Sequence, residues 1–147
     1  MRAQQEAIGS GNCHTAGMRI ILTGATGFVG SNIAKVLERH GDTVVADRVD
    51  MTDRDAVMSH VSSSEIDAVI HCAIMNDWHQ MHADRQAAWD AYVEATRHYA
   101  DAARLADVPF CLVSTDWVFD GTQTGATEDT PPNPVNLYGF LLSLIHI

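Results

Sequence analysis

The segment Thr23-Gly24-Ala25-Thr26-Gly27-Phe28-Val29-Gly30 decides the fold, because its three glycines lie between two different apolar patterns. Residues 19–23 form an apolar run typical of a strand buried on both faces. Residues 28–39 carry apolar side chains at helical spacing and end before Gly41, a residue type that favours helix C-termini. A glycine-rich turn between a strand and a helix is characteristic of a dinucleotide-binding unit, in which the helix N-terminus faces the pyrophosphate.

Each glycine of this segment has a different predicted role. Gly24 permits the tight turn, Gly27 lets the backbone approach the pyrophosphate, and Gly30 allows the helix to pack closely on the strand. We therefore expect the cofactor to contact these residues of the segment: Gly24, Gly27, Phe28, Val29 and Gly30. A turn without a ligand is the alternative, which the flanking strand and helix disfavour. The GK[ST] continuation of a nucleotide triphosphatase loop is missing.

The rest of the chain alternates short apolar runs with helical patterns. We predict strands at residues 43–46, 68–73 and 110–114, a helix from a cap at Thr52 to Val61, and a long helix at 88–105. This alternation is typical of the α/β class, with a parallel sheet and helices on both faces, as in NAD(P)-binding Rossmann-like folds. Cys72 and Cys111 fall in predicted strands, where we expect them to be buried.

The composition excludes several kinds of protein. The 147 residues are 46% apolar and 19% charged, which is typical of one globular domain. A net charge of −10 with scattered Lys and Arg residues leaves no basic face, so we expect no nucleic acid partner. No segment has the roughly 20 apolar residues of a membrane-spanning helix, and we expect no membrane partner. The three cysteines lie far apart, which favours a reducing compartment and predicts a cytoplasmic location.

Asp47 and Arg48 follow the second predicted strand, about 20 residues after the glycines, where such folds bind the adenosine ribose. A carboxylate there accepts hydrogen bonds from the ribose hydroxyls of NAD, whereas a guanidinium can pair with the 2′-phosphate of NADP. Two solvated charges in a turn are the alternative to both. Because the two neighbours favour different cofactors, the choice between NAD and NADP stays open.

Three further motifs carry a resemblance to a known family: Val113–Gly121 (VSTDWVFDG), Glu128–Pro131 (EDTP) and Asn136–Gly139 (NLYG). With the glycine motif they resemble the dTDP-4-dehydrorhamnose reductase family of extended short-chain dehydrogenases/reductases. The resemblance covers residues 18–141. It implies an NAD(P)-dependent oxidoreductase that reduces a nucleotide-linked 4-keto-sugar.

The resemblance also implies five cofactor-contacting residues: Asp50 and Met51 against the adenine, and Cys72, Ala73 and Ile74 along the cofactor channel. Thr115 and Tyr138 would be two members of the catalytic triad, with Tyr138 beside the cofactor. Hydride transfer to a carbonyl leaves an alkoxide that needs a hydrogen-bond donor and an acid, and these hydroxyls can supply both. A phenol has a pKa of about 10, which the family lowers with a Lys four residues later, where this chain has Leu142.

Two other features depart from the family pattern. Tyr92 stands where the superfamily usually has an Asn that helps to position the Lys. The segment Met75–His82 does not match the family either, and we predict a polar loop near the sugar. Its His79 and His82 lack a third ligand at suitable spacing, so we expect no metal site.

The two ends of the chain differ from its central part. Residues 1–17 are polar and precede the first apolar run, so we expect a disordered extension. Residues 142–147 break the family pattern and resemble the translation of a sequencing-library adapter, so we expect a non-native tail. Residues 18–141 then form a partial NAD(P)-binding domain, cut before its later strands and substrate-binding lobe. We expect this fragment to be inactive.

Two alternative functions fit the same residues. A nucleotide-sugar epimerase or dehydratase would use the same fold and cofactor on a nucleotide-sugar substrate. A cofactor-binding regulatory subunit without catalytic activity is the alternative from a different class. A natural Lys at position 142 would favour an enzyme over a regulatory subunit.

Overall fold

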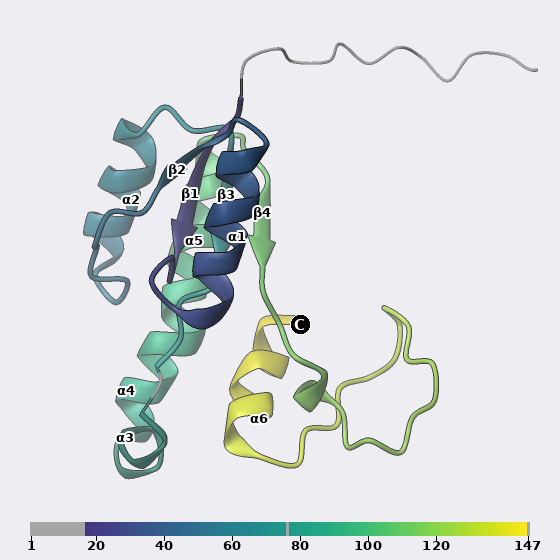
Figure 1. Ribbon diagram of the computed structural model, residues 1–147. Coiled ribbons are helices and arrows are strands. Elements are labelled where there is room, and N and C mark those ends of the chain that lie inside the picture. The colour runs from purple at the N-terminus through teal and green to yellow at the C-terminus, as the bar shows by residue number, and fades with distance from the viewer. Residues whose placement is uncertain (1–16, 76, 147) are drawn as a thin grey trace, which may run out of the picture.

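A four-stranded parallel sheet forms the centre of the computed structural model, which describes residues 17–75 and 77–146 (Figure 1). The strand order is β2-β1-β3-β4. The strands are β1 (Arg19–Thr23), β2 (Thr43–Val45), β3 (Ala68–His71) and β4 (Phe110–Leu112). The predicted α/β class and parallel sheet are confirmed. The last three strands end one or two residues earlier than predicted, because the chain leaves the sheet there to form loops.

Helices cover both faces of this sheet. Helix α1 (Phe28–Arg39) lies on one face, and α2 (Arg54–Ser63) and α5 (Ala95–Leu105) pack together on the other (Figure 1). The second face holds the larger buried cluster: Ile21, Val45, Val57, Val61, Val69, Tyr99, Ala102 and Ala103. The crossover from β1 places β2 on one side of β1, and the next crossover places β3 on the other side. The boundary between β1 and β3 is therefore the topological switch point at which such sheets bind ligands.

A second apolar cluster lies beyond the carboxyl ends of the strands. It is built from α3 (Trp78–Ala83), α4 (Arg85–Trp89), the π-helical turn η1 (Asp90–Glu94), the 3-10 turn η2 (Asp116–Val118) and α6 (Leu137–Ser143), which continues into η3 (Leu144–His146). Its buried members are Met81, Ala88, Tyr92, Val93, Val118, Leu141 and Leu142. The predicted long helix corresponds to α4, η1 and α5, which follow one another without a break. Its middle part, η1, is a π turn, a feature often found near functional sites.

Two helices were not predicted from the sequence. The segment Met75–His82, predicted as a loop, contains α3, which begins after Asp77, whose carboxylate accepts a hydrogen bond from Gln80 N. The sequence pattern does not indicate this helix because Met81 is its only buried side chain. Tyr138 lies in the first turn of α6, and Asn136 caps that turn by accepting from Gly139 N at 2.7 Å.

Two local expectations were also wrong. Asp53, and not Thr52, caps α2, because its carboxylate accepts from the backbone N–H groups of Asp55 and Ala56. Cys111 is exposed, because β4 has a single neighbour among the described strands and forms the edge of the sheet.

The extension predicted for residues 1–17 lies outside the described residues, Gly17 excepted. Within the part of the chain that the structure describes, no helix is long and apolar enough to cross a bilayer. The cytoplasmic location stays a prediction.

A buried hydrogen-bond network joins the ends of β1 and β3. The Thr23 hydroxyl oxygen accepts from the backbone N–H groups of Cys72 and Ala73, both at 3.1 Å, and lies 2.7 Å from His71 Nδ1. Two N–H donors occupy this oxygen, so its own proton is donated to His71 Nδ1. The imidazole is therefore neutral with its proton on Nε2, and burial lowers the pKa of His71 to about 4. This network fixes the chain that follows β3 against the end of β1.

We predict that His71→Asn makes stability less sensitive to acid. The amide oxygen can still accept the Thr23 proton but does not titrate. In the wild-type chain the pKa of His71 falls from 6.5 unfolded to about 4 folded. The unfolded state therefore gains a proton first as pH falls below 6.5, and the folded state loses up to about 3 kcal/mol of relative stability by pH 4. Urea unfolding at pH 7 and pH 4.5 should show a smaller loss for the variant, and equal losses would contradict the assignment.

Candidate cofactor and substrate site

A pocket of about 470 Å³ lies at the carboxyl ends of β1 and β3. It is lined by two segments far apart in sequence: Gly24, Thr26, Gly27, Phe28, Val29 and Gly30 from the turn and α1, and Cys72, Ala73 and Ile74 after β3. The structure thus brings the predicted glycine-turn residues together with the predicted channel residues. They meet at the topological switch point, where the fold places ligands.

The glycines of this pocket differ in how much room they leave for a side chain. Gly24 has φ +68°, a backbone conformation that residues with a side chain rarely adopt. A Cβ there would also lie 2.8 Å from Ala73 N, so there is no room for a side chain. A Cβ at Gly30 would overlap Gly24 O. Gly30 therefore allows α1 to pack on the turn itself, and not on the strand as predicted. Gly27 has an ordinary backbone conformation, and its Cβ would lie 3.2 Å from Gly24 O.

We predict a clear difference between two alanine substitutions in this turn. Gly30→Ala should destabilise the fold by about 2 kcal/mol or more, because backbone must move to remove the overlap. Gly27→Ala should cost less than about 1 kcal/mol, because a shift of a few tenths of an ångström relieves the contact. Urea unfolding of the two variants measures both values. Equal destabilisation would contradict the packing described for Gly30.

The segment after β2 lies outside this pocket. Asp47 and Arg48 are exposed. The carboxylate of Asp50 accepts from the Thr52 hydroxyl at 2.7 Å and from Thr52 N at 3.0 Å, and these hydrogen bonds lower its pKa. Met51 packs against the core cluster on the α2 face. The structure therefore does not bring these four predicted residues into contact with the glycine turn, and their cofactor roles stay predictions.

A second pocket, of about 310 Å³, adjoins the first. Its lining residues come from the β3–α3 segment, α3, η1, the β4–η2 region and α6: Ile74, Met75, Trp78, Met81, Tyr92, Thr115, Trp117 and Tyr138. Ile74 lines both pockets, so they share a wall. The two predicted catalytic residues, Thr115 and Tyr138, are thus brought together beside the glycine pocket.

Aromatic rings surround Tyr138 in this second pocket. Their centroids lie 5.9, 6.0 and 6.0 Å from that of Tyr138 and belong to Tyr92, Trp78 and Trp117. Burial raises the pKa of Tyr138, which is opposite to the lowering that the family obtains with its Lys, so the phenol is protonated at neutral pH but is a weaker acid than expected. The tryptophans were not predicted as site residues. The signal that could have found Trp78 is a single indole in an otherwise polar segment.

The Tyr92 ring contacts the Tyr138 ring edge-on, and its hydroxyl binds the segment between β3 and α3. Its hydroxyl donates to Met75 O at 2.9 Å. Burial, with a smaller contribution from Tyr138, raises the pKa of Tyr92 to about 12, so this donor stays protonated. Tyr92 thus occupies the position of the expected Asn but packs on the candidate proton donor.

The other two positions of the predicted catalytic triad are Thr115, which is polar, and position 142, which holds Leu142 in place of the expected Lys. The Thr115 hydroxyl accepts from Trp117 N and donates to Asp116 Oδ1, both at 3.3 Å, which are long hydrogen bonds. Leu142, at the position of the expected Lys, lies one turn after Tyr138 and is 2% exposed within the second apolar cluster. Position 142 therefore provides no positive charge beside the Tyr138 phenol.

The two histidines of α3 do not gather further ligands. Both His79 and His82 are exposed, and His82 Nδ1 lies 2.8 Å from Trp78 O. Among residues 17–75 and 77–146, no three His, Cys, Asp or Glu side chains are grouped as a metal site requires.

Residues 18–142 match the family described as the RmlD substrate binding domain. The chain belongs to this family. The RmlD-family chain is 32% identical over 125 residues to the dTDP-4-dehydrorhamnose reductase of Streptomyces griseus, covering 82% of this chain and 41% of the relative. It is also 28% identical over 131 residues to the methionine adenosyltransferase 2 subunit beta of Rattus norvegicus, covering 82% of this chain and 39% of that protein.

A solved structure shows the same architecture. The dTDP-4-dehydrorhamnose reductase of Bacillus anthracis, determined in complex with NADP, has a TM-score of 0.77 and 26% identity to the RmlD-family chain. The match covers 88% of this chain and 47% of that one. The Rossmann-like fold is therefore confirmed, and the chain spans about two fifths of the length of its curated relatives.

Proposed function

We propose that this chain is the N-terminal part of an NAD(P)-dependent reductase acting on a nucleotide-linked 4-keto-sugar. The supporting observation is the pair of adjoining pockets that share Ile74. One pocket is built on the glycine turn, and the other contains the Thr115 and Tyr138 hydroxyls. Because the two pockets adjoin at Ile74, a cofactor bound in one could meet a carbonyl bound in the other at direct contact, as hydride transfer requires.

The glycine pocket has the chemistry that a dinucleotide requires. Helix α1 has 12 residues, and its first turn carries no acidic side chain and no side-chain cap at Gly27. The backbone N–H groups and the helix dipole at this end therefore favour an anion such as the pyrophosphate. The bound cofactor supplies a hydride. Cys72, Ala73 and Ile74 would shield it from the opposite wall.

The aromatic pocket has the groups that a keto reduction requires. Tyr138 would donate a proton to the developing alkoxide. Burial raises the pKa of this phenol, so lowering it for catalysis would require a cation that the bound cofactor or the rest of the protein supplies. Thr115 would stabilise the oxygen by donating a hydrogen bond to it. Its hydroxyl now donates to Asp116 in a long hydrogen bond of 3.3 Å, which it could exchange for one to the substrate oxygen. The rings of Tyr92, Trp78 and Trp117 lie around the Tyr138 phenol and would present apolar surface to the substrate.

A cofactor-binding regulatory subunit is the second candidate function. One observation favours it: the similarity to the methionine adenosyltransferase 2 subunit beta is close to that with the reductase. Both candidates use the glycine pocket. They differ in whether Tyr138 acts as an acid.

We predict that Tyr138→Phe separates catalysis from cofactor binding. The variant belongs in the full-length protein, in which residues 18–141 are continued by their natural C-terminal half. Loss of the proton donor should lower kcat for a nucleotide-linked 4-keto-sugar about 100-fold or more, while the Kd for NADPH stays unchanged. Gly27→Asp is the matched control, because its carboxylate should abolish NADPH binding by repelling the pyrophosphate.

Two results would contradict the proposal. Unchanged kcat in Tyr138→Phe would remove the phenol from the mechanism, and NADPH binding by Gly27→Asp would remove the glycine turn from the cofactor site. NADPH binding without turnover in the wild-type full-length protein would favour the regulatory subunit. We also propose that the 147-residue chain alone is inactive, which turnover by that chain would refute.

A further inference from the structure

A long loop, residues 119–136, separates the two candidate catalytic residues along the chain. Thr115 directly precedes η2, and Tyr138 lies in the first turn of α6. Most residues of the loop are exposed, and it projects away from the sheet (Figure 1). The later residues of α6 pack in the second apolar cluster, but its first turn follows directly on the loop. Contacts at the base of the loop therefore influence where the Tyr138 phenol lies.

Two residues, Asp120 and Asn133, close the base of this loop, and we call them the loop clasp. The two carboxylate oxygens of Asp120 have different partners. Oδ1 accepts from Thr122 N at 2.8 Å and from the Thr122 hydroxyl at 2.6 Å, whereas Oδ2 accepts from Asn133 Nδ2. Asn133 N also donates to Val118 O at 2.9 Å, at the end of η2. The clasp thus fastens the returning chain to η2 three residues before Asn136, which caps α6.

The first turn of α6 lies directly against η2. A Cβ at Gly139 would overlap Trp117 O, so the two backbones are in contact without room for a side chain. Asn136 accepts from Gly139 N at 2.7 Å and holds the same turn. Because Thr115 begins η2 and Tyr138 precedes Gly139, the docking of α6 on η2 sets how the two candidate catalytic hydroxyls face each other.

We propose that Asp120 and Asn133 are positioning residues for Tyr138, and that their hydrogen bond sets the place of the phenol relative to Thr115 and a bound carbonyl. This inference rests on the proposed function, in which Tyr138 donates the proton. Neither clasp residue is among the described residues that line the aromatic pocket, so both act through the backbone at the loop base. A misplacement of about 1 Å can lower the rate of a reaction about 100-fold. The glycine pocket is built from other segments and should not change when the clasp is lost.

The decisive variants exchange the two partners of the clasp. Asn133→Asp places two carboxylates side by side and replaces the hydrogen bond by repulsion. The double variant Asp120→Asn/Asn133→Asp restores the hydrogen bond with donor and acceptor exchanged. The amide oxygen at position 120 can still accept from Thr122, while its amide nitrogen donates to the carboxylate at position 133.

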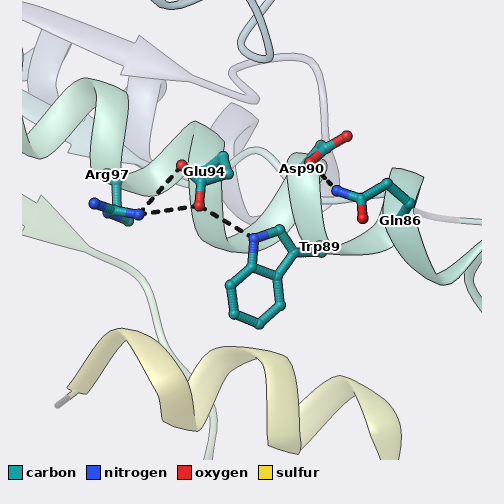
Figure 2. Close-up of polar contacts among 5 residues, drawn as sticks. All are labelled: Gln86, Trp89, Asp90, Glu94 and Arg97. Carbon is teal, nitrogen blue, oxygen red and sulfur yellow. Dashed lines mark hydrogen bonds and ion pairs between the residues drawn. The ribbon is translucent and has the colours of Figure 1, made fainter.

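Gln86 and Asp90 provide a matched control. Figure 2 shows Gln86 Nε2 donating to Asp90 Oδ1 at 2.8 Å, which joins an amide and a carboxylate as the loop clasp does. Gln86 is exposed on α4, and neither residue is among the described residues that line the glycine or aromatic pocket. Gln86→Glu therefore adds the same charge beside a carboxylate without changing the loop base.

The test measures turnover and cofactor binding in the full-length protein. Steady-state reduction of dTDP-4-dehydrorhamnose with NADPH gives kcat, and calorimetry gives the Kd for NADPH. Asn133→Asp should lower kcat about tenfold or more, because the proton donor is misplaced, and leave the NADPH Kd unchanged. The double variant should recover most of the wild-type kcat. Gln86→Glu should keep the wild-type kcat.

The split between kcat and the NADPH Kd separates positioning from a folding defect, since a folding defect would weaken NADPH binding as well. The inference is overturned if Asn133→Asp keeps the wild-type kcat, or if the double variant recovers none of the loss. Parallel losses of kcat and NADPH binding in Asn133→Asp would also overturn it. Wild-type protein that binds NADPH without reducing the sugar would instead overturn the proposed function, and the inference with it.

Discussion

At the carboxyl ends of β1 and β3, the backbone of Gly24 lies so close to that of Cys72 and Ala73 that no Cβ fits between them. The Thr23 hydroxyl, which accepts the N–H groups of those two residues, holds the same approach. The glycine turn and the chain after β3 therefore form one wall. Ile74, the next residue, lines both the glycine pocket and the aromatic pocket. The candidate cofactor and substrate positions thus depend on one backbone contact.

The sequence predicted the parts of this arrangement that depend on local patterns. The bounds of β1 and α1 agree with prediction, because a buried strand, a glycine turn and an amphipathic helix each leave a distinct signal. The sequence also predicted that Gly24 and Gly30 leave no room for a side chain. It did not predict which atom a side chain at Gly30 would meet. That atom belongs to a carbonyl of the turn, which only the folded backbone brings close.

The parts that sequence analysis missed depend on tertiary packing. Helix α3 has one buried side chain, too few for a helical pattern, and the cluster of rings around Tyr138 joins four elements separated along the chain. The exposure of Cys111 follows from the place of β4 at the edge of the described sheet, which an apolar run does not reveal. Local patterns predicted the residues of the glycine pocket better than those of the aromatic pocket, because the glycine pocket is built from one turn and one strand end.

Both pockets lie within residues 18–142, the part of the chain that matches the family. The glycine turn, Thr115 and Tyr138 belong to the motifs that carry the resemblance, whereas Trp78 and Tyr92 line the pocket of Tyr138 but lie outside those motifs.

Amide hydrogen exchange of the full-length protein with and without NADPH tests the central claim most directly. The account predicts that NADPH slows exchange in residues 24–31 and 72–75, which meet at the glycine pocket. Helix α2 lies away from that pocket and serves as the internal control, with no change expected across residues 54–63. Unchanged exchange in the glycine turn at saturating NADPH would contradict the account.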